Sequence, residues 1–202
     1  MKYISHLDVM RLWERALRRA AIPMGYSQGF SPHPKISIAA PLAIGVTSEG
    51  ELMDVMVRRR TSPYQFTKMV SEQLPRGIGL LRAEQVGLRA PSLQSQVRQA
   101  EYEVDLELDE ATADVEAAIR CFLAKERLPW QHRRDRDVRH YDLRPLVHRI
   151  WVVDRGSAQC TLGMRLRNDS KATGRPEQVT AALGFADRPR SIRRTKLILA
   201  GS

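Results

Sequence analysis

The sequence predicts an α+β fold built from two consecutive subdomains of one pattern. The chain has 202 residues, enough for one large domain or two small ones. In each half, short apolar runs typical of strands alternate with longer runs whose apolar residues have helical spacing. The expected order is strand, helix, strand, strand, helix, strand. A polar, turn-rich stretch separates the halves, so we expect subdomains over residues 1–87 and 101–202 and a connector over 88–100.

The first half begins with the end of a strand, residues 2–4, and then a helix. Ser5 followed by Asp8 has the pattern of a capping box, and Pro23 limits the helix to about Ala21. Later elements are expected as strands over 35–46, 52–57 and 78–86, with a helix that starts at Pro63 and ends near Leu74.

The second half begins the same order again, with one additional strand candidate. Strands are expected over 101–108, 130–140, 147–153, 159–167 and 192–199, with helices over 110–127 and 176–183. The succession is that of the split βαβ, or ferredoxin-like, motif. The sequence therefore predicts two tandem ferredoxin-like subdomains.

The charge balance favours a polyanionic partner. The chain contains 33 Lys and Arg against 23 Asp and Glu, a net charge of +10. Binding RNA would release counterions from each neutralised phosphate and so gain affinity. The alternative is a basic surface that only keeps the protein soluble.

Composition also limits cofactors and location. Cys121 and Cys160 are too few for a zinc site or a disulfide framework, and both are expected in the core. No cysteine cluster with iron–sulfur spacing exists, so we expect no metal or cluster held by this chain. The longest apolar run, 36–46, is shorter than the roughly 20 residues that span a bilayer, and no export leader is present. We therefore expect a cytoplasmic protein without a membrane partner.

The stretch YSQGFSPHPKIS, residues 26–37, is the strongest candidate for a binding loop. Prolines on both sides of His33 restrict the backbone, and Gly29 allows a turn or a close approach. Its aromatic rings offer faces for an unstacked base, and its polar side chains offer directional donors. The alternative is a structural plug, with both rings between helix and sheet and His33 bonded to a backbone carbonyl. The candidate substrate-binding residues of the loop are Tyr26, Gln28, Phe30, His33 and Lys35.

Arginines outside the loop supply candidate phosphate contacts. Those in the first helix recur with a spacing that forms a basic stripe, and those near the C-terminus have little acidic compensation. The two sets are Arg11, Arg15 and Arg18, and Arg188, Arg190, Arg193 and Arg194.

The candidates for acid–base chemistry have less support in the sequence than the loop and the arginines. His6 follows the cap of the first helix, where the helix dipole favours a neutral imidazole able to accept a proton or bind a metal; packing against the loop is the alternative. Glu49, Glu51 and Asp54 could act as acid and base or hold a cation, but a scaffold role is favoured, in which Glu51 pairs with Arg11 or Lys35. The sequence leaves the role of His6 open.

The segments SHLD at 5–8, YSQGFSPHPKIS at 26–37 and GVTSEGELMD at 45–54 resemble the opening of the radical SAM-linked protein family, a domain of unknown function. DLRPLV at 142–147, GRPEQV at 174–179 and RTKLIL at 194–199 extend the resemblance over the chain. Members carry a longer first strand before SHLD, so either the start is misassigned or that strand is truncated here.

The resemblance implies an accessory protein of RNA metabolism that works beside a radical SAM enzyme. Any SAM or iron–sulfur cluster would then belong to that partner. The expected fold also resembles RAMP-type RNA-binding folds, some of which cleave RNA without metal. By that analogy, His33, Tyr26 and Lys35, with His6 as a further candidate, would be catalytic. The third alternative is a module that only docks on the partner enzyme.

Overall fold

The computed structural model describes residues 2–108, 114–134, 137–185 and 188–201. The chain forms an α+β fold with two compact units, Met1–Gln96 and Val97–Ser202. The division falls inside the polar stretch 88–100. No helix in the described ranges is long and apolar enough to cross a membrane.

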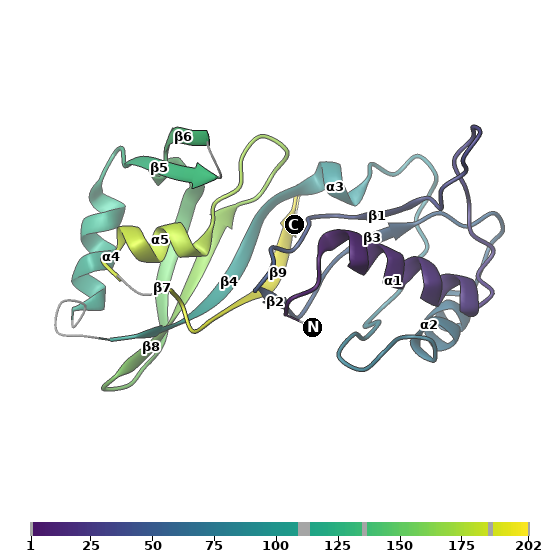
Figure 1. The fold of residues 1–202 in the computed structure, drawn as a ribbon, viewed down its shortest axis with the longest axis horizontal. Coiled ribbons are helices and arrows are strands. Elements are labelled where there is room, and N and C mark those ends of the chain that lie inside the picture. The colour runs from purple at the N-terminus through teal and green to yellow at the C-terminus, as the bar shows by residue number, and fades with distance from the viewer. Residues whose placement is uncertain (1, 109–113, 135–136, 186–187, 202) are drawn as a thin grey trace. The chain divides into compact units, whose positions relative to one another are not determined.

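The first unit contains three helices and three short strands among its described residues (Figure 1). Strands β1 and β3 pair antiparallel, with Ser37 opposite Asp54. The elements are α1 (His6–Arg19), β1 (Ile36–Ile38), β2 (Thr47–Ser48), β3 (Met53–Val55), α2 (Pro63–Ser71) and α3 (Leu93–Gln96).

Helix α1 begins where the capping box predicts. The Ser5 hydroxyl accepts the backbone N–H of Asp8 at 3.2 Å and donates to the Asp8 carboxylate at 2.7 Å. The hydrogen bond from Ser5, with Arg11 nearby, lowers the pKa of Asp8. The helix ends as Ala21 turns to a φ of 51° and the Ile22 N–H bonds back to the Leu17 carbonyl at 3.1 Å. Helix α2 starts at Pro63, as expected.

Two strands predicted for the first half are absent from the described residues. Lys2 and Tyr3 lie in a turn, Ile4 belongs to no strand, and residues 78–86 run without a partner strand. In the second of these segments Leu81 and Val86 are exposed. A strand needs a hydrogen-bonded neighbour, which local sequence cannot supply. The described part of the first unit therefore pairs β1 with β3 alone, and the tandem ferredoxin-like prediction is not confirmed.

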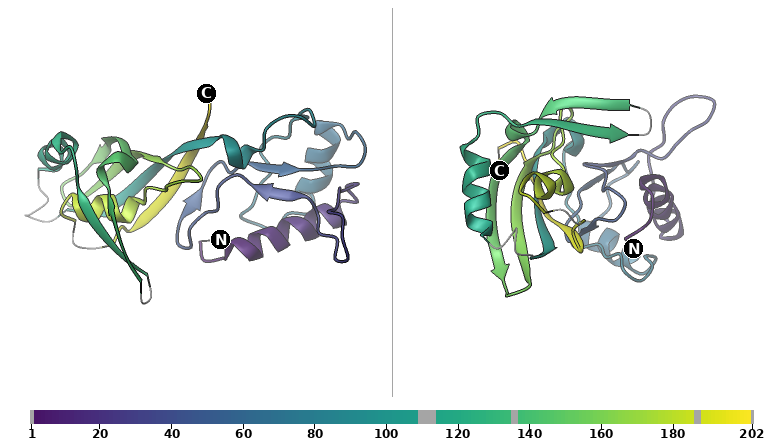
Figure 2. Two further views of the ribbon diagram at one scale, coloured as in Figure 1. Left: turned by 90° about the horizontal axis from the view of Figure 1, so that it is seen from above. Right: turned by 60° about the vertical axis from the view of Figure 1, so that its left-hand side comes forward.

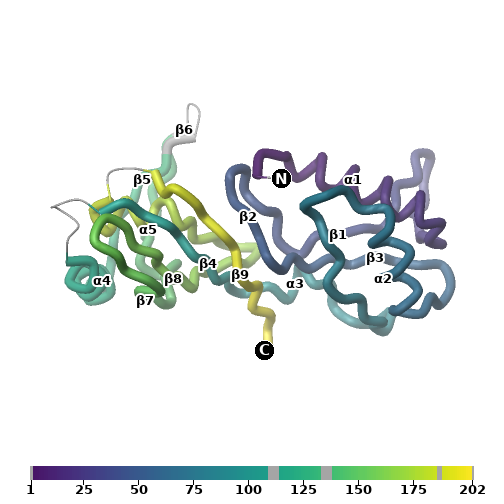
Figure 3. The backbone as a smooth tube through the Cα atoms, turned by 90° about the horizontal axis from the view of Figure 1, so that it is seen from below, coloured from purple at the N-terminus to yellow at the C-terminus, as the bar shows by residue number. Residues whose placement is uncertain are grey.

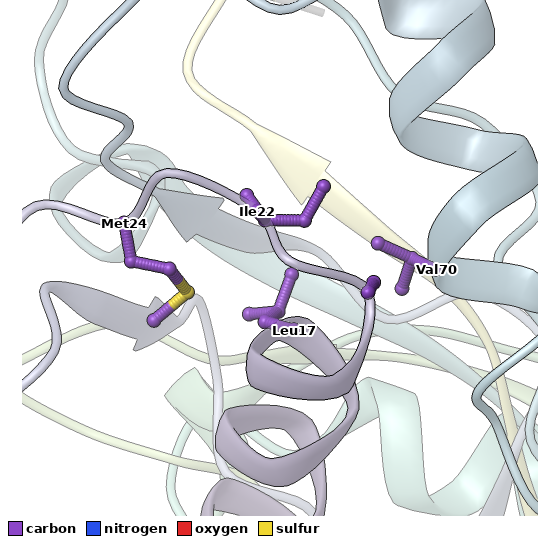
Figure 4. Close-up of a cluster of buried hydrophobic side chains, with 5 residues drawn as sticks. Leu17, Ile22, Met24 and Val70 are labelled. Atoms are coloured by element: carbon purple, nitrogen blue, oxygen red, sulfur yellow. The ribbon is translucent and has the colours of Figure 1, made fainter.

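The core of the first unit packs the end of α1 against α2. Leu17 and Val70 are fully buried and meet Ile22 and Met24, which follow the helix (Figure 4). Partly buried residues around this cluster include Tyr26. The root of the 26–37 loop is thus anchored in the hydrophobic core.

In the second unit the strands lie in the order β9-β4-β8-β7, each antiparallel to its neighbours (Figure 3). With α4 after β4 and α5 after β8, succession and strand order are those of a split βαβ unit. Strands β5 and β6 add a hairpin after α4 where one strand was predicted. The elements are β4 (Val97–Glu107), α4 (Val115–Ala124), β5 (Pro129–Arg134), β6 (Asp137–Asp142), η2 (Arg144–Leu146), β7 (Val147–Arg155), β8 (Gln159–Arg167), α5 (Pro176–Ala182) and β9 (Ser191–Leu199).

The sheet of the second unit has one buried and one charged face. Tyr102, Val104 and Leu106 of β4 are buried, and the acidic residues between them are not. On the charged face, Arg165 donates to Glu101 at 2.7 Å and Arg193 pairs with Glu103. These cations are therefore already neutralised within the sheet.

A glycine on this sheet accommodates a tryptophan. A Cβ atom at Gly163 would lie 2.0 Å from Cε2 of Trp151, its neighbour on β7. We expect Gly163→Ala to lower the free energy of unfolding by about 1–3 kcal/mol through overpacking. Urea denaturation measures this. In a Trp151→Ala background the same change should cost far less, and an equal cost in both backgrounds would contradict the contact.

Candidate nucleic-acid interface

Residues 26–35 form a closed hairpin that projects from the first unit (Figures 1 and 2). The Ser27 N–H donates to the His33 carbonyl at 2.8 Å, and the His33 N–H donates to the Ser27 hydroxyl at 2.9 Å. Below this pair, Tyr26 lies opposite Pro34, and the Lys35 N–H bonds to the Gly25 carbonyl at 2.9 Å. The stem is thus fixed by backbone bonds, and we call residues 26–35 the hairpin.

The tip of the hairpin is exposed. Phe30 is 109% exposed, and Gln28, Pro32 and His33 are also on the surface. Gly29 has a φ of 129°, a conformation that side chains rarely allow. The structural-plug alternative is therefore wrong for Phe30, whose ring contacts no core.

Tyr26 has a structural position. It is partly buried and packs against the hydrophobic cluster of the first unit. The guanidinium of Arg58 lies over its ring, 5.4 Å from the centroid. This cation–π contact occupies a face that a base could otherwise use. Of the two candidate aromatic residues, the structure leaves Phe30 accessible.

Three consecutive arginines, residues 58–60, lie beside the root of the hairpin. The Arg58 N–H donates to the Pro23 carbonyl at 2.7 Å, and Val57 is bridged to Met24. All three arginines are exposed, as is Lys35. Within the described residues, no carboxylate forms an ion pair with any of these four cations. We call residues 58–60 the arginine triplet.

The surrounding sequence strengthens the positive charge. Residues 15–48 contain no Asp or Glu, and neither do residues 55–71. The first range includes the hairpin, and the second includes the triplet. Opposite charges that would neutralise a phosphate site are thus absent from both segments.

The basic stripe of α1 is partly neutralised. Arg11 lies 3.4 Å from the Asp8 carboxylate, and Arg18 donates to Glu14 at 2.9 Å. Both pairs are on the surface, where ion pairs are weak and a phosphate can compete. Arg15 is exposed.

His6 and the hairpin lie at opposite ends of α1. His6 is its first residue, and the hairpin follows its last turn. Fourteen residues of helix separate the two by about 21 Å. The structure does not bring His6 together with His33.

The residues of the hairpin that were predicted to be catalytic also lie on opposite faces of it. Tyr26 lies opposite Pro34, while Ser27 pairs with His33 and Gly25 with Lys35. Because successive residues of extended chain face opposite sides, Tyr26 faces away from His33 and Lys35. The arrangement lacks the single face that such a triad requires.

The arginines near the C-terminus are less suited to phosphate than the sequence indicated. Arg194 is 2% exposed in β9, so it cannot reach a surface ligand. Arg193 pairs with Glu103, and Arg190 lies 3.6 Å from Glu107. Arg188 is exposed, as expected for a phosphate contact.

The remaining candidates have structural surroundings. The Asp54 carboxylate accepts the Leu93 N–H at 2.8 Å, at the start of α3. Glu49 and Glu51 are exposed. No group of three or more His, Cys, Asp or Glu in the described ranges is placed to hold a metal ion. Cys160 is buried as predicted, but Cys121 is exposed, so its assignment to the core was wrong.

The DLRPLV segment joins several elements of the second unit. The Asp142 carboxylate accepts the backbone N–H groups of Leu128 and Arg144 at 2.8 and 3.0 Å. The Arg144 guanidinium donates to the carbonyls of Leu123 and Val147. This motif therefore stabilises the fold of the second unit.

The arginine triplet and Ser27 are site residues that the sequence alone did not indicate as binding candidates. The signal that could have found the triplet was the lack of acidic residues over 15–48 and 55–71. The Ser27–His33 pairing has no signature in the sequence, because it depends on how the loop closes.

Comparison with known proteins gives a family and a fold. A family model described as "Uncharacterized protein conserved in bacteria (DUF2344)" matches residues 1–176. No curated protein matches the chain. Among solved structures, a chain of a Cbf5-Nop10-Gar1 complex is similar over 98% of this chain, at 11% identity and a TM-score of 0.54. A chain of the archaeal box H/ACA sRNP Nop10-Cbf5 complex is similar over 98% of this chain, at 11% identity and a TM-score of 0.48.

This chain spans less than half the length of those two solved chains, 46% and 45%. At such low identity, the first likeness shows a shared fold and nothing of the ligand. Function must therefore be argued from the site.

Proposed function

We propose that this chain, which belongs to the DUF2344 family of uncharacterised proteins conserved in bacteria, binds RNA as an accessory protein and presents it to a partner enzyme. One observation carries the proposal. Arg58, the first residue of the arginine triplet, and Lys35 lie at the root of a closed, projecting hairpin, and none of the four cations of the triplet and Lys35 has an acidic partner among the described residues. Such an arrangement suits the phosphates of a nucleic acid.

The contrast between the two units supports this location. The charged sheet face of the second unit already pairs Arg165 with Glu101 and Arg193 with Glu103. A polyanion binding there would have to displace these carboxylates. At the triplet it would displace only counterions and water.

The partner enzyme in this proposal is a radical SAM protein, because the sequence resembles radical SAM-linked proteins. SAM and the iron–sulfur cluster would belong to that enzyme. The RNA-cleaving alternative has less support, since Tyr26 faces away from His33 and Lys35 on the hairpin. Docking on the partner without RNA remains the competing function that the experiment must separate.

The test is the salt dependence of RNA affinity. The probe is a fluorescein-labelled single strand of about 12 nucleotides, long enough for one binding site. Four phosphate contacts predict that affinity falls about 50-fold between about 50 and about 200 mM salt. Fluorescence anisotropy measures the affinity at each salt concentration.

Each other outcome counts against the proposal. No RNA binding at low salt, with co-purification of a radical SAM enzyme, would favour docking. Cleavage of the probe in EDTA to a 2′,3′-cyclic phosphate would favour the endoribonuclease. Equal affinity for a DNA strand of the same sequence would contradict a preference for RNA.

A further inference from the structure

Phe30 is an unusual residue to leave in water. It is 109% exposed, whereas Tyr26, four residues earlier, is anchored in the core. Large aromatic side chains normally bury most of their surface, and exposed ones are common where another molecule binds. Phe30 lies in the exposed tip of the hairpin, and the hairpin projects from the first unit (Figure 2).

The backbone on both sides of Phe30 is restrained before any ligand arrives. The Ser27–His33 pair closes the stem with two hydrogen bonds, and Pro32 and Pro34 restrict the chain that follows the ring. Less conformational entropy is therefore lost on binding than with a flexible loop. A preformed exposed ring can contribute most of its contact energy to affinity.

The chemistry of the ring limits what it can recognise. Phenylalanine has no hydrogen-bonding group in its side chain, so it cannot read the edge of a base. It can stack on the face of any base, which makes the contact tolerant of sequence. Inside a duplex each base is covered on both faces by its neighbours. An unpaired base offers a free face.

The arginine triplet lies at a suitable distance for the same strand. Arg58 is over Tyr26, and four residues of chain between Tyr26 and Phe30 span at most about 14 Å. A short single strand of a few nucleotides covers that distance. One short single strand can therefore reach from the triplet to the ring.

We infer that the ligand is a short unpaired RNA segment, with one base stacked on Phe30 and the phosphates of the segment on Arg58, Arg59 and Arg60. This inference rests on the proposed function, RNA binding at the hairpin. It adds that the site selects single strands over duplexes and does not select a base sequence.

The experiment compares a single-stranded RNA of about 12 nucleotides with the same strand annealed to its complement. Phe30→Ala should weaken binding of the single strand by about 5- to 150-fold and leave duplex binding unchanged. The slope of affinity against salt should stay the same, because no charge is lost. Phe30 is fully exposed, so all its variants should fold, which circular dichroism checks.

Two further variants test stacking itself. Phe30→Trp keeps a flat ring and should retain the affinity of the wild-type protein, with a change in tryptophan fluorescence when RNA binds. Phe30→Leu keeps an apolar side chain without a ring and should behave like Phe30→Ala. If the Phe30→Leu protein binds single-stranded RNA as tightly as the wild-type protein, the inference that a base stacks on Phe30 is wrong.

The results also separate this inference from the proposed function. If Phe30→Ala binds single strands like the wild type, and affinity still falls steeply with salt, RNA binding survives and stacking fails. Equal affinity of the wild type for strand and duplex also overturns the inference alone. If the wild type binds neither RNA, both proposals fail, and Phe30 becomes a contact for a partner protein.

Discussion

Replacing Arg58, Arg59 and Arg60 together by glutamine will weaken the binding of single-stranded RNA by about 100-fold at about 0.1 M salt. Each phosphate contact with a single strand contributes about 0.7 to the slope of log affinity against log salt, so three contacts contribute about 2. The triple replacement should therefore reduce the slope of log affinity against log salt by about 2. Anisotropy titrations at several salt concentrations measure both the affinity for RNA and its dependence on salt.

A matched control removes the same charge elsewhere. Arg120, Arg127 and Arg139 are exposed arginines of the second unit, and their triple replacement by glutamine lowers the net charge equally. Affinity should then change by only a few-fold, through the long-range field. Equal losses in the two triple variants would show that the net charge, and not the site beside the hairpin, holds the RNA.

The second large effect is on stability. Leu17→Ala will lower the free energy of unfolding of the first unit by about 3 kcal/mol, because it leaves a cavity among Ile22, Met24 and Val70. Leu17 is fully buried at the end of α1 (Figure 4). Urea denaturation followed by circular dichroism measures the loss.

Leu7→Ala is the control for this change. Leu7 is on the same helix but 64% exposed, so its removal should alter stability by less than about 0.5 kcal/mol. Below its unfolding temperature the Leu17→Ala protein should bind RNA with nearly normal affinity, since neither Phe30 nor the arginine triplet is changed. Similar losses of stability in the two variants would contradict the position of Leu17 in the core.

Local signals in the sequence predicted local structure well. The capping box at Ser5 marks the start of α1, and Pro63 marks the start of α2, because each acts through atoms within one helical turn. The strand predicted over 101–108 is present as β4, although it begins earlier, at Val97. These features depend on neighbours along the chain.

Predictions that needed a distant partner were less successful. Residues 78–86 have the composition of a strand but no neighbour to pair with, and residues 130–140 became parts of two strands. Arg193 and Arg194 are adjacent and chemically identical. One is paired on the surface and the other is buried, because successive strand residues face opposite sides of the sheet.

The sequence by itself determined the basic charge, the capped helices and the rigid chemistry of the 26–37 loop. Only the tertiary structure decided that the arginine triplet lies beside that loop, and that Tyr26 is anchored while Phe30 is exposed. Each of these depends on which segments far apart in the chain bond and pack together. Residue type alone does not encode that choice, since the free energy of a contact exists only once both partners are in place.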